Sequence, residues 1–151
     1  QLRSVRTVKA DRHLATKLNV PEGAPLVEIH RVRLLNREPV SLEQTWVPEA
    51  LGKRLAGADL ATRDIFLILE NDCGVPLGHA DVSIDAILAD DEIVDALRVE
   101  ESSPVLRIER LTHDASGTPI DYEYLYFRGD AFQYRLRIDR QKALQPARNP
   151  Q

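Results

Sequence analysis

The sequence lacks the features that stabilise small secreted or disulfide-rich proteins. It contains one cysteine, Cys73, and no methionine among its 151 residues. A single cysteine excludes an internal disulfide framework and is typical of a reducing compartment, so we interpret Cys73 as an ordinary thiol near a helix end. Because no initiator methionine is present, residue 1 is either a processing product or, as we expect, a cut inside a longer protein.

Long apolar runs and an excess of positive charge are also missing. No segment approaches the roughly 20 apolar residues of a transmembrane helix, and no basic-then-apolar leader opens the sequence. The 20 basic residues are outnumbered by 24 acidic ones, whereas a surface that binds a nucleic-acid backbone is usually strongly basic. We therefore expect a cytoplasmic domain that does not contact a membrane and that reaches DNA only through another segment.

Signatures of common enzymes are sparse. The sequence has no glycine-rich phosphate loop, no Gly-x-Ser-x-Gly turn and no zinc-type spacing of cysteine and histidine. The four histidines, His13, His30, His79 and His113, are scattered along the chain. We predict that His30 and His113 are solvated, and we expect no catalytic residue, no cofactor and no metal site.

Two segments of the chain resemble each other, residues 13–35 and residues 92–114, and the likeness continues into the hairpin strand after each. Each copy is typical of a short helix, a proline-containing loop and a β-hairpin. Two copies are too few for a solenoid, which favours one pseudo-symmetric domain. The matched pairs include Leu18 with Leu97, Arg31 with Arg110, Glu43 with Glu123, and Trp46 with Tyr126.

Capping residues mark where the helices begin. Asp11 precedes the first helix, and Asp90 or Asp91 precedes the equivalent helix of the second copy. Between the copies, residues 48–57 predict a surface helix that Gly57 ends. Residues 62–74 predict a second helix, with Thr62 or Asp64 as its cap and Gly74 as its stop.

Alternating apolar residues predict the strands outside the hairpins. Residues 76–89 are expected to form a half-buried strand whose inward row is Ala80, Val82, Ile84, Ala86 and Leu88. After a turn at Gly129, a last strand is expected to bury Phe132, Tyr134, Leu136 and Ile138 on one face. Residues 1–9 are expected to be a linker or first strand, and residues 141–151 a tail. The class is therefore α+β, with a mainly antiparallel sheet and flanking helices in a single domain.

Two arginines lie on a strand face that should be apolar. In a strand over residues 26–35, Arg31 and Arg33 share a face with Val27 and Ile29. Glu43 lies on the neighbouring strand, within reach of both. One interpretation is an internal ion pair that holds the sheet together. The other is a ligand site, because two guanidinium groups against one carboxylate leave a positive surplus suited to an anion.

The order of these elements resembles the UTRA effector-binding domain of GntR-type bacterial transcription regulators. The likeness covers nearly the whole chain. Its most specific part is the close, where a Gly-x-Pro turn leads to a strand that ends in aromatic-Arg-Gly-Asp. The resemblance implies a chorismate lyase-like fold, a homodimer, and a preceding winged helix-turn-helix domain that binds operator DNA and is absent from this chain.

The resemblance also implies which residues line an effector pocket. In the family these are the Arg-x-Arg pair, the glutamate ten residues on, the start of the middle helix, and acidic and aromatic positions of the second hairpin. The corresponding residues are Arg31, Arg33, Glu43, Asp64, Phe66, Asp121 and Phe127, with Glu123 as the alternative to Asp121 if the alignment shifts by two.

Three of these positions differ from members that sense sugar phosphates. There the position of Asp64 tends to carry a hydroxyl, and those of Phe66 and Phe127 tend to be tyrosine. An aspartate would repel a phosphate, and the phenylalanines remove sugar-binding hydroxyls. We therefore favour a small carboxylate or an amino acid over a sugar phosphate.

Three functional hypotheses remain open from the sequence. The first is a ligand sensor whose effector changes operator binding by the missing domain. The second is a chorismate lyase-like enzyme in which Glu43 acts as general acid or base. The third is a dimerisation module without a ligand, which predicts that Arg33→Ala strongly destabilises the domain.

Overall fold

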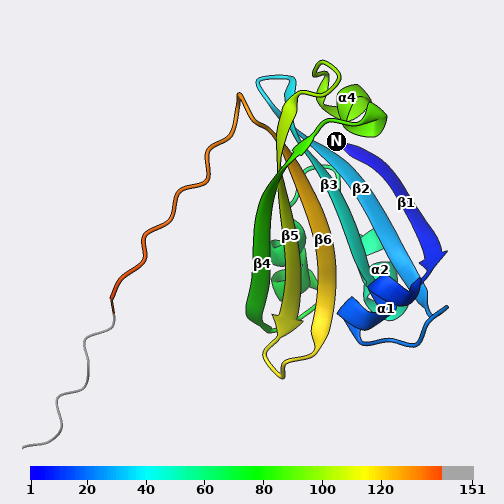
Figure 1. The fold of residues 1–151 in the computed structure, drawn as a ribbon. Coiled ribbons are helices and arrows are strands. Elements are labelled where there is room, and N and C mark those ends of the chain that lie inside the picture. Colours follow the sequence, from blue (N-terminus) through cyan, green and yellow to red (C-terminus); the bar gives the residue numbers. More distant parts are fainter. Residues whose placement is uncertain (141–151) are drawn as a thin grey trace, which may run out of the picture.

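One antiparallel sheet of six strands organises the domain (Figure 1). The computed structural model describes residues 1–140. The strands lie in the order β1-β2-β3-β6-β5-β4, so each half of the sheet is one continuous stretch of the chain. The strands are β1 Leu2–Lys9, β2 Pro25–Leu35, β3 Glu38–Pro48, β4 Leu77–Leu88, β5 Pro104–Asp114 and β6 Pro119–Arg128.

The predicted repeat is visible in the topology. α1 (Arg12–Leu18) connects β1 to β2, and α4 (Asp91–Leu97) connects β4 to β5. In each half a hairpin follows the helix, and the two halves meet where β3 pairs with β6. Only the segment between the halves, with α2 (Glu49–Ala56), α3 (Ile65–Leu67) and the π-helix Ile68–Asp72, has no counterpart in helices among the described residues.

The capping predictions for the two equivalent helices are confirmed. The side chain of Asp11 accepts a hydrogen bond from the backbone N–H of Leu14 at 2.8 Å. That of Asp90 accepts from Ile93 at 3.0 Å, so Asp90 rather than Asp91 is the cap. Such caps satisfy backbone donors that have no partner inside the helix.

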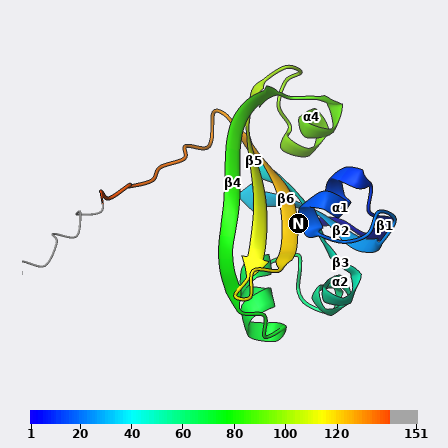
Figure 2. The same ribbon diagram turned by 60° about the horizontal axis from the view of Figure 1, so that its bottom comes forward.

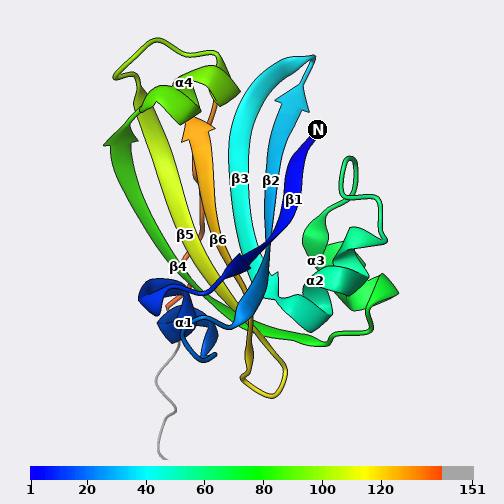
Figure 3. The same ribbon diagram turned by 90° about the vertical axis from the view of Figure 1, so that its right-hand side faces the viewer.

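Helices cover both faces of the sheet (Figures 2 and 3). α1 and α4 lie on one face, where α4 packs with Val32 and Leu42. α2, α3 and the π-helix lie on the other face, over the half formed by β2 and β3 (Figure 3). There Val27 and Ile29 share one apolar cluster with helix residues such as Leu55.

The middle helix is shorter and less regular than predicted. Asp64 is its cap, since its Oδ1 accepts from the N–H groups of Phe66 at 2.8 Å and Leu67 at 3.3 Å. Only α3 is α-helical, and the chain continues as a π-helix before Gly74, whose φ of 64° ends it. No helix in residues 1–140 is long and apolar enough to cross a membrane.

The prediction of a half-buried β4 is wrong for this chain on its own. β4 forms over the expected residues, but Val82 is 46% exposed, Ile84 41% and Leu88 67%. The alternation is present. The burial is not, because the helices on that face cover β2 and β3 and leave β4 bare.

The predicted final strand is also wrong. The chain turns at Gly129 as expected, but residues 132–140 have no sheet partner and leave the domain (Figure 1). Tyr134, Leu136 and Ile138 are exposed, and only Phe132 stacks on the domain, 3.9 Å from the ring of Phe127. The tail predicted for residues 141–151 lies outside the described residues.

Candidate functional site

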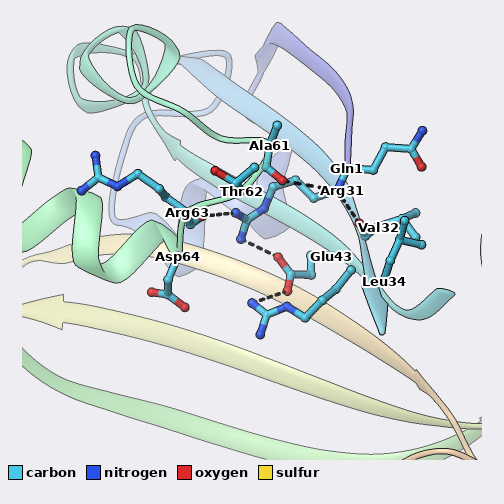
Figure 4. A pocket seen from close by; sticks show the side chains of 10 residues that line it. Gln1, Arg31, Val32, Leu34, Glu43, Ala61, Thr62, Arg63 and Asp64 are labelled. Carbon is cyan, nitrogen blue, oxygen red and sulfur yellow. Dashed lines mark hydrogen bonds and ion pairs between the residues drawn. The ribbon is translucent and has the colours of Figure 1, made fainter. Parts of the chain in front are cut away.

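Arg31 is fixed in place by three elements. It lies directly opposite Glu43 in the register of β2 and β3, and its Nη2 donates to Glu43 Oε2 at 2.5 Å. Its Nη1 donates to the backbone carbonyl of Arg63 at 2.8 Å and, more weakly, to that of Leu60 at 3.4 Å (Figure 4). Arg31 is 9% exposed. It therefore ties the sheet to the segment that leads into α3.

Arg33 shares a carboxylate with Arg31 but is far more accessible. Its Nη2 lies 3.2 Å from Glu43 Oε1, and its side chain is 56% exposed. The two arginines lie on one face of β2, as alternation predicts. The ion-pair interpretation thus describes Arg31, whereas the Arg33 guanidinium remains available to a further partner.

The second copy repeats the pair. Arg110 lies directly opposite Glu123 in the register of β5 and β6, and its Nε donates to Glu123 Oε1 at 2.5 Å. The Arg110 guanidinium also lies over the ring of Phe66, 4.4 Å from its centroid, which is favourable for a cation. Burial raises the pKa of Glu123, an effect that the nearby positive charge of Arg110 opposes.

Two adjoining cavities lie over these pairs. The larger, about 440 Å³, is bounded by β2 and the segment before α3 (Figure 4). The smaller, about 190 Å³, reaches across the sheet to β5 and β6. Their volumes are in the range of small-molecule sites, which span roughly 300–1,000 Å³. The residues common to both are Arg31, Arg33, Glu43 and Asp64.

The structure brings most of the predicted residues together in the smaller cavity. Its lining contains seven of them: Arg31, Arg33, Glu43, Asp64, Phe66, Glu123 and Phe127. With Arg110 included, three arginines face three carboxylates. The positive surplus expected from Arg31, Arg33 and Glu43 alone is therefore balanced at the formal level, and the lining offers both donors and acceptors.

Asp121 does not line either cavity. It is fully buried, and neither of its carboxylate oxygens has a hydrogen-bond partner among the described residues. Burial, and secondarily the neighbouring charge of Glu123, raises the pKa of Asp121 well above its ordinary value. Of the two alternatives for the second hairpin, Glu123 is the one that reaches the cavity.

Arg110 is the lining residue that the sequence reasoning passed over. The internal repeat matches it with Arg31, and this was the signal that could have identified it. Arg63, Ile65 and Leu125 also line the cavities. They carry no motif of their own, and only the folded path of the chain brings them to the site.

Comparison with known proteins places this site in a family. The sequence profile of the UTRA domain matches residues 1–133. The HTH-type transcriptional repressor NagR of Bacillus subtilis is 26% identical over 133 residues, which are 88% of this chain and 54% of NagR. The chain thus spans about half the length of this relative.

Solved structures agree on the fold. The effector domain of PhnF from Mycobacterium smegmatis matches with a TM-score of 0.85 at 22% identity, covering 92% of this chain and 85% of that one. A GntR-family transcriptional regulator from Bacillus cereus matches with a TM-score of 0.81 at 23% identity, covering 92% and 96%. These relatives are regulators, which favours the sensor hypothesis over the lyase alternative. The chain belongs to the UTRA domain family, the effector-binding domains of GntR-type transcription regulators.

Proposed function

We propose that this domain senses a small metabolite bearing a carboxylate, such as an amino acid, and that Arg33 is its principal anion-binding residue. The observation that carries the proposal is the state of the Arg33 side chain. It lines both cavities and is 56% exposed, and its ion pair with Glu43 is longer than that of Arg31. A guanidinium in this state can bind a carboxylate through two parallel hydrogen bonds at little cost in desolvation.

The acidic residues of the site favour a ligand that also carries a donor. Asp64 uses Oδ1 to cap α3 and lines both cavities, so the same carboxylate can meet an amino or hydroxyl group. Phe66 and Phe127 add two ring surfaces without hydroxyls to the smaller cavity. A multiply charged phosphate would meet three carboxylates there, which makes a carboxylate or zwitterion the better match.

Dimerisation gives the ligand a route to DNA. The bare row of β4 continues the face that carries the pocket, since Val82 pairs in register with Arg110. Isolated exposed apolar side chains are ordinary, but a row along one strand is typical of a contact surface. We infer that two copies of the chain associate through β4. Operator binding would then belong to a winged helix-turn-helix domain that precedes the sensor in the full protein.

Ligand binding must favour one dimer geometry over another in order to regulate anything. A ligand changes an equilibrium only by as much as its affinities for the two states differ. The pocket lining spans β2, β3, β5 and β6, so a bound molecule contacts both halves of the sheet. Such a ligand would be sensitive to small movements of one half against the other.

The test is a thermal-shift screen of the chain against amino acids, small carboxylates, sugar phosphates and phosphonates. A ligand at a hundred times its dissociation constant adds about 2.7 kcal/mol to the free energy of unfolding, which is readily detected. Arg33→Ala should abolish the shift. Arg12→Ala, an exposed arginine on α1 outside the lining residues, is the matched control and should keep it.

Two results would count against this proposal. A response confined to phosphorylated compounds would overturn the ligand class. A carboxylate response that survives in Arg33→Ala would remove Arg33 from its assigned role.

A further inference from the structure

Three side chains with metal-binding groups meet on the face of the sheet opposite the pocket. They are His79 and Asp81 on β4 and His113 on β5. Each can offer one ligand atom, and these atoms all lie within 4.8 Å of one another. The cluster brings together residues 34 positions apart in the sequence, and no local spacing motif announces it.

The backbone explains why these residues converge. The register of β4 and β5 shifts between Leu77 and Ala80, where β4 bulges. Gly78 lies in this bulge, and a Cβ there would overlap the backbone carbonyl of Asp114. The close approach of the two strands positions His79 beside His113, whose rings stack with centroids 4.2 Å apart and planes 14° from parallel. Asp81 follows two residues later, on the same side of β4.

None of the three side chains is engaged elsewhere. Within residues 1–140, no hydrogen bond or ion pair involves His79, Asp81 or His113. Nδ1 of His113 is moreover buried without a hydrogen-bond partner in the described part of the chain. A buried imidazole nitrogen without a partner is costly, and two unprotonated histidines beside a carboxylate form a donor set that would satisfy a cation.

We propose that His79, Asp81 and His113 form a binding site for a late first-row divalent transition metal ion, of which Zn²⁺ is the representative. Two imidazoles and one carboxylate are borderline ligands that such ions prefer and that Mg²⁺ and Ca²⁺ do not. Tetrahedral zinc with bonds of about 2.0–2.1 Å holds its ligand atoms about 3.3 Å apart. His79 and Asp81 are exposed, so their side chains can close the remaining distance by rotation.

This site departs from the expectation of no metal drawn from the sequence and is separate from the effector pocket. The pocket row of β4 and β5 includes Val82 and Arg110, which are paired in register. Asp81 pairs with Leu111, so its side chain projects from the opposite face. Three protein ligands leave a fourth position for water or for a donor from another molecule. Metal binding would also join edge strand β4 to β5 by a second kind of bond.

The experiment is calorimetric titration of ZnCl₂ into the untagged, chelator-treated chain. We expect one zinc ion per chain, with the affinity reduced at least tenfold in His79→Ala and in His113→Ala and also reduced in Asp81→Asn. Ser83→Ala is the matched control, because Ser83 is exposed on the same strand and the same side and is not a member of the cluster. Far-UV circular dichroism identifies any variant that has lost its fold.

A second measurement separates this site from weak surface binding. Co²⁺ bound by two imidazoles and a carboxylate in a site of low coordination number gives visible absorption that hydrated Co²⁺ lacks. This absorption should appear in wild type and Ser83→Ala and be lost in His79→Ala. The proposal is overturned if wild type does not bind zinc, or if His79→Ala and His113→Ala bind it as tightly as wild type.

Discussion

Arg31 and Glu43 lie directly opposite each other on β2 and β3, and their side chains meet at 2.5 Å in a nearly dry environment. Both groups are largely removed from water, so neither can lose its partner without leaving a charge in the interior. The pair is therefore a structural element of the site and forms the floor on which Arg33 acts.

This difference between the two arginines predicts opposite costs of removal. Arg31→Ala leaves Glu43 buried with only the longer contact to Arg33, and we expect it to lower the free energy of unfolding by about 3–5 kcal/mol. Arg33→Ala removes a half-exposed ion pair, which is worth about 0–1 kcal/mol. Urea denaturation without ligand measures both. A large loss in Arg33→Ala would restore the hypothesis of a dimerisation module without a ligand.

A double variant tests whether the cost in Arg31→Ala comes from the unpaired charge. Arg31→Met with Glu43→Gln replaces both charges by groups of similar size. Buried ion pairs are often replaceable in this way, so the double variant should be more stable than Arg31→Met alone. Equal stability would assign the loss to the hydrogen bonds that Arg31 donates to the backbone of Arg63 and Leu60.

Asp121 predicts a stability that falls as the pH rises. Below its ordinary pKa near 3.8 the carboxyl is protonated in both the folded and the unfolded chain. Since burial raises the pKa in the folded state, the unfolded chain loses this proton first and is favoured as the pH increases. Asp121→Asn should be more stable than wild type at neutral pH, by about 1–3 kcal/mol.

The pH dependence of that gain is the sharper readout. In urea melts between pH 4 and pH 8, the advantage of Asp121→Asn should shrink toward acid. Asp114→Asn is a control of opposite sign. Its pKa is lowered by the hydrogen bond from Ser116, so removing the charge should destabilise the domain at neutral pH and matter less toward acid. A constant advantage for Asp121→Asn would mean that Asp121 is ionised in the folded chain.

Gly52 allows α2 to lie directly on β2. A Cβ at this position would overlap Cβ and Cγ2 of Val27. Gly52→Ala should therefore destabilise the domain by about 1–3 kcal/mol, the usual cost of an overpacked core. Gly57→Ala is the matched control, because a Cβ there meets only the carbonyl of Arg54 at 3.7 Å. If both variants melt at the wild-type temperature, α2 is free to shift away from the sheet.

The bare row of β4 predicts a dimer that one charge can weaken. Ile84 is 41% exposed on the pocket side of β4, and a lysine there would be buried in an apolar contact between two chains. Ile84→Lys should raise the dimer dissociation constant at least tenfold, about 1.4 kcal/mol. Ser83→Lys places the same charge on the other face of the strand and should not. Sedimentation equilibrium measures both, and identical dissociation constants would exclude β4 from the interface.

The predictions from sequence succeeded where a local rule decides the outcome. Asp11 and Asp90 cap helices because a side-chain oxygen before an apolar stripe satisfies orphan N–H groups wherever the helix packs. The pairing of Arg31 with Glu43 follows from the length of one hairpin. These features need only neighbours in the sequence.

The failures concern what lies above a strand. Alternation in β4 assigns Val82 and Ile84 to one face, but it does not say whether any element covers that face. The same limit produced the wrong final strand, since Leu136 and Ile138 alternate without a partner strand in the described chain. Arg110 and the cluster of His79 with His113 were missed because their contacts depend on the register of β5 with its neighbours.

The unequal content of the two repeats gives the domain its polarity. After β3 the chain lays α2 and α3 over its own half of the sheet, whereas after β6 residues 132–140 depart without returning to the sheet. A duplicated frame has thus kept one roofed bay and one unroofed bay. A second chain placed over the unroofed bay would complete the enclosure that the first chain builds for itself only once.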